Sequence, residues 1–249
     1  MWLGSPLTRK LSVITLRASI TLSEVPMSAS KTIPLTRPSS GTAFRKRKYT
    51  LGQLRTDAAV LSGRRKEVQA IWGSEHRVTP QMREQVMLGV ARVNACGFCT
   101  YIHQENALEA GVDLDFLGAV AGVERTPDMD DDAMLAVLWA TSRAENNLGP
   151  ADEALDAVFK ERFTEEEQRD LDTVLRGMHM MNLCGNTLEA LLWRLRGNRV
   201  PGSRLVDEVL IGGGYFLGAI PMGVLTARQR GKTVRTAFQE AVATIRAAA

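Results

Sequence analysis

The sequence predicts an all-α protein, and three observations lead to that fold class. Helix-capping residues recur from about residue 50 to residue 197, and the apolar residues between them repeat with a helical period. The alternation of apolar and polar residues that is typical of a strand appears only in segment 11–22. An apolar content of 45% and a charged content of 24% are ordinary for a globular protein, and 249 residues suffice for one sizeable core.

The individual helices follow from their start and stop signals. Thr79 is placed to cap a helix whose first residue is Pro80, and Gly111 suits the left-handed residue that ends the next helix. Thr164 and Glu167 form the capping box of a long helix. The predicted helices cover residues 54–72, a segment that starts at residue 80, and residues 96–111, 113–120, 133–145, 151–159, 164–196 and 232–248.

Charge and composition divide the chain into three segments. Residues 1–50 hold nine lysines or arginines and one acid, a sum of +8, whereas the other residues hold 22 basic and 27 acidic groups, a sum of −5. Residues 1–48 are therefore expected to form a flexible basic arm, residues 49–200 a helical domain and residues 201–249 a helical extension. Because the positive charge belongs to the arm, a nucleic-acid-binding face is not expected on the domain.

The extension contains a run without charged residues. Residues 209–227 read VLIGGGYFLGAIPMGVLTA, which nearly reaches the length of a membrane span. Its glycines and Pro221 make it a poor isolated helix, so burial within the chain or beneath another subunit is the favoured interpretation. Contact with a membrane is the second interpretation, which the following Arg228, Arg230, Lys232 and Arg235 would suit.

The residues best suited to chemistry lie between Arg83 and Gly111, in REQVMLGVARVNACGFCTYIHQENALEAG. On a helix that begins near Cys96, the side chains of Cys96, Cys99 and His103 share one face. A helix N-terminus favours a thiolate, and His103 lies one turn beyond Cys99 and can take its proton. Glu84 shares an apolar helix face, where a carboxylate is costly without a partner. Two antiparallel helices would bring Glu84 to His103, giving a carboxylate, an imidazole and a thiol.

This stretch resembles the alkylhydroperoxidase D / carboxymuconolactone decarboxylase family. The family pattern is a glutamate, eleven residues, a cysteine, two residues, a cysteine, three residues and a histidine, and Glu84, Cys96, Cys99 and His103 match it. The resemblance is strongest over 83–111 and weaker over about 50–197. Well-studied peroxidases of the family carry a second histidine between the cysteines, where this chain has Phe98.

The resemblance implies a helical bundle that self-associates into trimers or larger rings and reduces hydroperoxides without a bound cofactor or metal. Cys99 would attack the peroxide and Cys96 would resolve the product, while His103 and Glu84 relay the proton. The expected partners are a hydroperoxide, an external dithiol reductant protein and further copies of the chain. Three cysteines, two of them in a C-x-x-C unit, also fit a reducing, cytoplasmic compartment.

Several alternatives remain open from the sequence. Cys96, Cys99, His103 and Glu84 can instead be the ligands of a zinc site. The chain can also be a lactone decarboxylase of the same superfamily, or a non-enzymatic redox-sensing or assembly protein whose basic arm and apolar extension serve a partner or a membrane. Glu84 can instead pair with an arginine such as Arg92, and His103 can be a packed helix residue. Phe98 and Tyr101 are expected as pocket walls, and Cys184 as a core residue. His76 and His179 have no partner that the sequence identifies.

Overall fold

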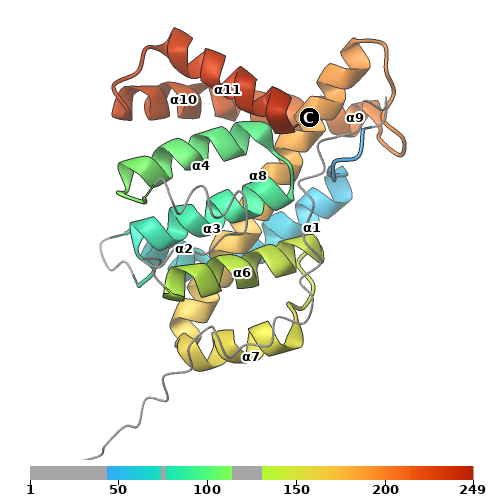
Figure 1. Cartoon of the computed structure of the whole chain (residues 1–249). Helices are drawn as coiled ribbons and strands as arrows, with labels where there is room; N and C mark the ends of the chain where they lie inside the picture. The colour runs from blue at the N-terminus through green and yellow to red at the C-terminus, as the bar shows by residue number, and fades with distance from the viewer. Residues whose placement is uncertain (1–43, 74–76, 114–130, 249) are drawn as a thin grey trace, which may run out of the picture.

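The computed structural model describes residues 44–73, 77–113 and 131–248, and every regular element in these ranges is helical, which confirms the all-α prediction (Figure 1). The alternating segment at 11–22, the predicted helix at 113–120, His76 and most of the basic arm lie outside the described residues. The helices are α1 (Leu51–Ser62), α2 (Arg65–Trp72), α3 (Pro80–Val93), α4 (Gly97–Glu109), α6 (Asp131–Glu145), α7 (Glu153–Arg162), α8 (Glu165–Leu195), α9 (Leu205–Asp207), the π-helical turn η2 (Glu208–Gly212), α10 (Gly213–Gln229) and α11 (Val234–Ala248).

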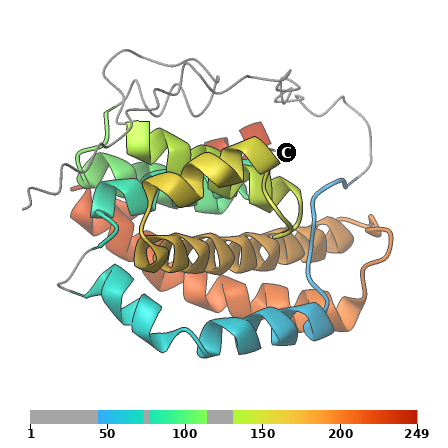
Figure 2. The same cartoon turned by 90° about the horizontal axis from the view of Figure 1, so that it is seen from below.

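The long helix α8 runs through the middle of the molecule. Figure 2 shows α6 and α7 on one side of it and α1, α2 and α10 on the other. In Figure 1, α4, α3, α6 and α7 follow one another as a stack, with α10 and α11 above α4. The main core lies where α3, α4, α6, α7 and α8 meet, and its fully buried members include Leu88, Val90, Leu171, Val174 and Leu175.

Local capping chemistry explains where most helices begin. Thr79 accepts a hydrogen bond from the Met82 amide, as an N-cap residue does, and Pro80 opens α3. Both halves of the capping box at Thr164 and Glu167 are present, so the predicted start of α8 is confirmed. The single helix predicted over 54–72 is wrong, because α1 ends at Ser62 and α2 begins at Arg65. Gly63 caps α1 there, consistent with its low helix propensity.

Residues 44–48, which were assigned to the flexible arm, pack against the domain instead. Lys46 forms an ion pair with Glu189 of α8 at 2.6 Å, and Arg47 donates to the carbonyl of Ala144 at 2.7 Å. Phe44 packs edge-on against Trp193 with ring centroids 6.3 Å apart. The basic run therefore anchors the entry of the chain to α8 and to the end of α6.

The charge-free run is helical despite its glycines. The turn η2 and α10 continue from α9 without interruption, and Pro221 lies inside α10. Tertiary packing supplies the reason at one point: a Cβ on Gly212 would come within 2.8 Å of the Leu188 backbone, so only glycine permits this approach to α8. Burial of the run within the chain was nevertheless the wrong expectation, because only 17% of the most apolar window of 205–229 is buried.

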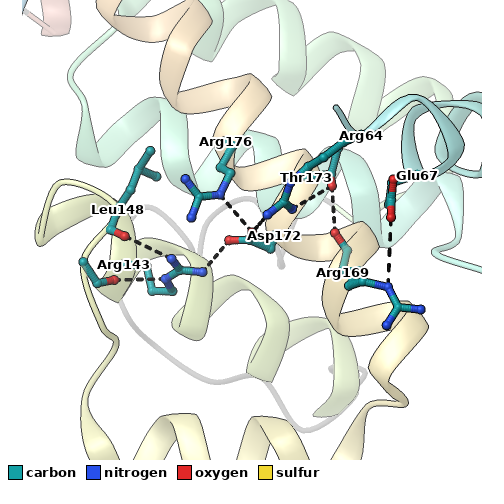
Figure 3. Close-up of polar contacts among 9 residues, drawn as sticks. Arg64, Glu67, Arg143, Leu148, Arg169, Asp172, Thr173 and Arg176 are labelled. Carbon is teal, nitrogen blue, oxygen red and sulfur yellow. Dashed lines mark hydrogen bonds and ion pairs between the residues drawn. The ribbon is translucent and has the colours of Figure 1, made fainter. Parts of the chain in front are cut away.

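One aspartate joins three parts of the fold (Figure 3). Asp172 of α8 accepts a hydrogen bond from Arg176 at 2.9 Å. It also forms ion pairs with Arg64 at 2.7 Å and with Arg143 of α6. Burial alone would raise the pKa of Asp172, but the hydrogen bond from Arg176 and the three cationic charges hold it below its ordinary value. Asp172 therefore stays ionised and connects α6 and the α1–α2 junction to α8.

Candidate functional site

A tight turn between α3 and α4 places the two cysteines. Ala95 adopts a left-handed backbone conformation with φ of 56°, and the Cys96 amide donates to the carbonyl of Ala91 at 3.0 Å. Asn94 is 3% exposed, and its carbonyl accepts a hydrogen bond from the Asn186 side chain of α8 at 2.8 Å. The turn is thus fixed from both sides, and it sets Cys96 at the N-terminus of α4.

Cys96 and Cys99 lie at disulfide distance and form a pair, with their Cα atoms 5.3 Å apart. Cys96 is the N-cap residue of α4, and its sulfur accepts a hydrogen bond from the Cys99 amide at 3.4 Å. Both side chains are buried, at 1% and 4% exposed. The exposed amides of a helix N-terminus stabilise negative charge, so this position favours the thiolate of a reduced cysteine.

Glu84 and His103 form the second pair of the site. Oε2 of Glu84 on α3 lies 2.8 Å from Nδ1 of His103 on α4, and Oε1 accepts from Arg83 at 3.1 Å. Burial would raise the pKa of Glu84, but the hydrogen bond and charge of His103, together with Arg83, lower it below its ordinary value. An ionised Glu84 therefore accepts from Nδ1–H, which leaves Nε2 of His103 as the nitrogen that can exchange a proton.

The arginine beside Glu84 is its sequence neighbour Arg83, not Arg92 as the structural alternative suggested. Arg83 also donates to the carbonyl of Ile71 at the end of α2, which fixes the guanidinium. Glu84 thus has both an arginine and a histidine partner. His103 follows Cys99 by four residues on α4, a spacing that sets their Cβ atoms about 5–6 Å apart.

Tyr215 of α10 belongs to the site, and sequence reasoning missed it. Its hydroxyl lies 3.2 Å from the Cys99 sulfur, although 116 residues separate the two. Burial raises the pKa of Tyr215, so the phenol stays protonated and can donate to sulfur. The one available signal was that Tyr215 and Thr226 are the two polar side chains in an otherwise apolar run.

Glycines allow neighbouring helices to close over the cysteines. A Cβ on Gly185 of α8 would lie 2.8 Å from the Cys96 sulfur and 3.2 Å from the Tyr215 ring and hydroxyl. A Cβ on Gly97 would lie 2.5 Å from the backbone of Ile245 in α11. The helices of the C-terminal extension therefore cover the N-terminus of α4 and contribute directly to the site.

Other predicted residues take mainly structural positions. Tyr101 is buried and donates from its hydroxyl to Glu240 of α11 at 3.1 Å, whereas Phe98 packs edge-on against Tyr215. Cys184 is 8% exposed, as a core residue should be, and burial raises the pKa of its thiol to about 12. His179, for which the sequence identifies no partner, is 1% exposed with Nδ1 3.3 Å from the Asn94 side chain.

Burial also governs the titration of His179. It lowers the pKa of the imidazole to about 4, which keeps the ring neutral next to the turn that carries the cysteines.

The two best-formed cavities lie away from the predicted site. One, of about 710 Å³, lies beside α6, α7 and α8, and the other, of about 590 Å³, lies beside α1 and α8; neither is lined by any of the four predicted site residues. Among the described residues, no three His, Cys, Asp or Glu side chains are grouped to hold a metal ion.

Comparisons with models of protein families, with curated proteins and with solved structures find no match for this chain. The likeness to the alkylhydroperoxidase D family therefore stays a prediction from the motif. The arguments that follow rest on the geometry of Glu84, His103, the two cysteines and Tyr215.

Proposed function

We propose that the protein is a thiol-dependent peroxidase that reduces hydroperoxides through Cys96 and Cys99. The observation that carries the proposal is the Cys96–Cys99 pair at the N-terminus of α4, beside a carboxylate–imidazole pair. A disulfide between residues three apart, inside a helical core, is a product of thiol oxidation that an external dithiol can reduce again. Neither step needs a bound metal or organic cofactor.

The first step consumes the peroxide. The Cys99 thiol gives its proton to Nε2 of His103, and the resulting thiolate attacks the terminal oxygen of the hydroperoxide. The O–O bond breaks, Cys99 becomes a sulfenic acid, and the alkoxide leaves as an alcohol after taking the proton from His103. Glu84 orients the imidazole and stabilises its protonated form through Nδ1–H. Tyr215 donates to the Cys99 sulfur while the sulfur carries charge.

The second step regenerates the disulfide. The Cys96 thiolate attacks the sulfur of the Cys99 sulfenic acid, the S–O bond breaks, and hydroxide leaves as water after protonation. A reducing dithiol then exchanges with the Cys96–Cys99 disulfide, which returns two thiols and leaves the external pair oxidised. One hydroperoxide and one external dithiol are consumed in each cycle, and one alcohol, one water and one external disulfide form.

Serine variants test the assignment of the two cysteines. Cys99→Ser should abolish peroxide turnover, whereas Cys96→Ser should still consume about one equivalent of peroxide and stop at a sulfenic acid that dimedone traps. Cys184→Ser is the control, because Cys184 forms no disulfide and is buried in a second cluster with Tyr49, Leu183 and Ile211. Turnover by Cys99→Ser at the rate of the unaltered protein would contradict the proposal.

Two observations favour a non-enzymatic redox sensor as the second candidate. The two sulfurs are buried, and Tyr215 links Cys99 to the largely exposed helix α10. A sensor of this kind would oxidise once without sustained turnover and change its association through α10. Steady peroxide consumption with an excess dithiol donor separates the peroxidase from the sensor.

A further inference from the structure

The helical stretch Leu205–Gln229 has an apolar surface that the protein itself does not cover. It spans 25 residues; its most apolar window of 18 residues has a mean hydropathy of 1.6, and 17% of that window is buried. The large side chains that are about half exposed or more are Leu205, Val209, Leu210, Phe216, Leu217, Ile220, Met222 and Leu225. We call these eight residues, of which the first three lie in α9 and η2 and the other five in α10, the α10 face. At about 25 cal/mol per Å², their exposure carries a substantial cost in water unless a partner covers them.

The charges around the α10 face indicate which partner it fits. Between residues 197 and 239 there are two acids, Asp207 and Glu208, and both are buried, at 3% and 0% exposed. Glu208 is neutralised by Arg194 of α8 at 2.5 Å. The exposed ionic residues of this segment are all basic: Arg199, Arg204, Arg228 and Arg235.

These basic residues flank the α10 face at both ends. Arg199 and Arg204 precede it, and Arg228 and Arg235 follow it, with Arg235 set between the exposed side chains of Val234 and Phe238 on α11. An exposed apolar helix face with cations at both ends matches the acyl and headgroup layers of an anionic lipid surface. A contact between two copies through this face would instead bring like charges together, which opposes association.

The inner side of the same stretch shows how it would bind. Asp207 accepts from the Leu51 amide at 3.1 Å, Glu208 pairs with Arg194, and Tyr215 contacts Cys99. A transmembrane orientation would have to break these contacts with α1, α8 and α4. The geometry therefore suits a helix that lies in the lipid interface, with its inner side still packed on the protein.

We propose that the α10 face docks the protein onto an anionic membrane surface, with the stretch Leu205–Gln229 lying flat in the headgroup region. Apolar side chains of the face enter the acyl boundary, and the flanking arginines contact lipid phosphates. Docking does not depend on peroxide chemistry, because none of the eight face residues is part of the proposed redox site.

Vesicle flotation with the full chain tests the docking. The unaltered protein should float with vesicles of phosphatidylcholine and phosphatidylserine, bind vesicles of pure phosphatidylcholine far less, and dissociate as salt rises. Leu217→Glu with Ile220→Glu should reduce binding by at least about tenfold. Leu138→Glu is the matched control, because Leu138 is an exposed leucine of α6, 36% exposed, and should leave binding unchanged.

A second pair of variants tests the electrostatic contribution of the flanking arginines to vesicle binding. Arg228→Gln with Arg235→Gln should weaken binding about tenfold or more, at about 1 kcal/mol for each cation near the surface. Arg55→Gln with Arg65→Gln removes the same charge from α1 and α2 and should have a small effect. Circular dichroism and formation of the Cys96–Cys99 disulfide confirm that each variant is folded.

Three results would overturn the docking. Equal flotation of the unaltered protein and of the Leu217/Ile220 variant would show that the α10 face is not the contact. If the unaltered protein fails to bind anionic vesicles, and light scattering shows an oligomer that Leu217→Glu with Ile220→Glu dissociates, the α10 face would instead contact a second copy of the chain. Failure to bind vesicles with a monomer in solution would show that the face remains uncovered.

Discussion

At the residue scale, the carboxylate of Glu84 determines which nitrogen of His103 can exchange a proton. Because the pKa of Glu84 is lowered, the carboxylate stays ionised at neutral pH and holds Nδ1–H at 2.8 Å. Glu84→Gln keeps the shape but removes the charge that stabilises protonated His103. We expect the second-order rate constant with hydroperoxide to fall by about tenfold to a hundredfold.

The control for this change is Glu105→Gln, another buried carboxylate, on α4, which pairs with Lys232 at 2.7 Å and with Arg230 at 3.2 Å. It should leave the rate with hydroperoxide within about twofold. A rate constant in Glu84→Gln equal to that of the unaltered protein would remove Glu84 from the mechanism.

The lowered pKa of Glu84 also gives the sign of its contribution to stability. This contribution to the free energy of unfolding is present above the unfolded pKa of about 4.3 and is lost as the pH falls through the folded pKa.

The hydroxyl of Tyr215 gives a second prediction at the residue scale. Tyr215→Phe removes the donor 3.2 Å from the Cys99 sulfur and changes little else. A hydrogen bond to a charged group contributes about 1.5–3 kcal/mol, so alkylation of reduced Cys99 by iodoacetamide should slow about tenfold at neutral pH. Tyr101→Phe, which removes the bond to Glu240 instead, should leave this alkylation rate unchanged.

At the scale of elements, the contact of α8 with the site depends on one glycine. Gly185→Ala would place a Cβ 2.8 Å from the Cys96 sulfur, and we expect a loss of about 1–3 kcal/mol in the free energy of unfolding. Gly177→Ala is the matched control on the same helix, because a Cβ there meets no atom within 4 Å. It should stabilise the protein by about 0.5–1 kcal/mol, so denaturant midpoints that move in the same direction would contradict the packing argument.

Elements were predictable from the sequence where local chemistry decides them. Thr79, Pro80 and the Thr164–Glu167 box mark the starts of α3 and α8, because capping involves residues within one turn. Packing decides the charge-free run instead: its glycines argue against an isolated helix, yet Gly212 of η2 permits a close approach to α8. For the same reason, the order of helices in space did not follow from capping and periodicity alone.

At the scale of the whole molecule, Asp172 neutralises arginines from three places in the fold (Figure 3). Asp172→Asn leaves three guanidinium groups close together without a counter-charge, and we expect a loss of about 2–3 kcal/mol in the free energy of unfolding. Asp132→Asn, whose partner Arg162 is exposed, should cost less than about 1 kcal/mol. Equal losses in the two variants would contradict the role given to Asp172.

The pH dependence of the Asp172 contribution also has a definite sign. Its folded pKa lies below the ordinary value, so the stabilisation is complete above the unfolded value of about 3.9 and disappears as the pH falls through the folded value. Unfolding by urea across pH 2 to 6 should therefore show a steeper acid loss in the unaltered protein than in Asp172→Asn.

The site was predictable in the part that a short motif encodes. Cys96, Cys99 and His103 lie within eight residues, so helical geometry alone aligns them, and a carboxylate on an apolar face needed a partner. The contact of Tyr215 with Cys99 depends on how the C-terminal helices fold back over α4, which no local pattern specifies. Sequence spacing likewise did not show how deeply the two sulfurs are buried.

The most direct test of the account is a thiol count on the reduced protein before and after one equivalent of hydroperoxide, with mass mapping of all three cysteines. We predict rapid loss of two thiols, recovered as a Cys96–Cys99 disulfide, while Cys184 stays reduced. Three thiols that persist after the peroxide has been added would contradict a redox role for the pair.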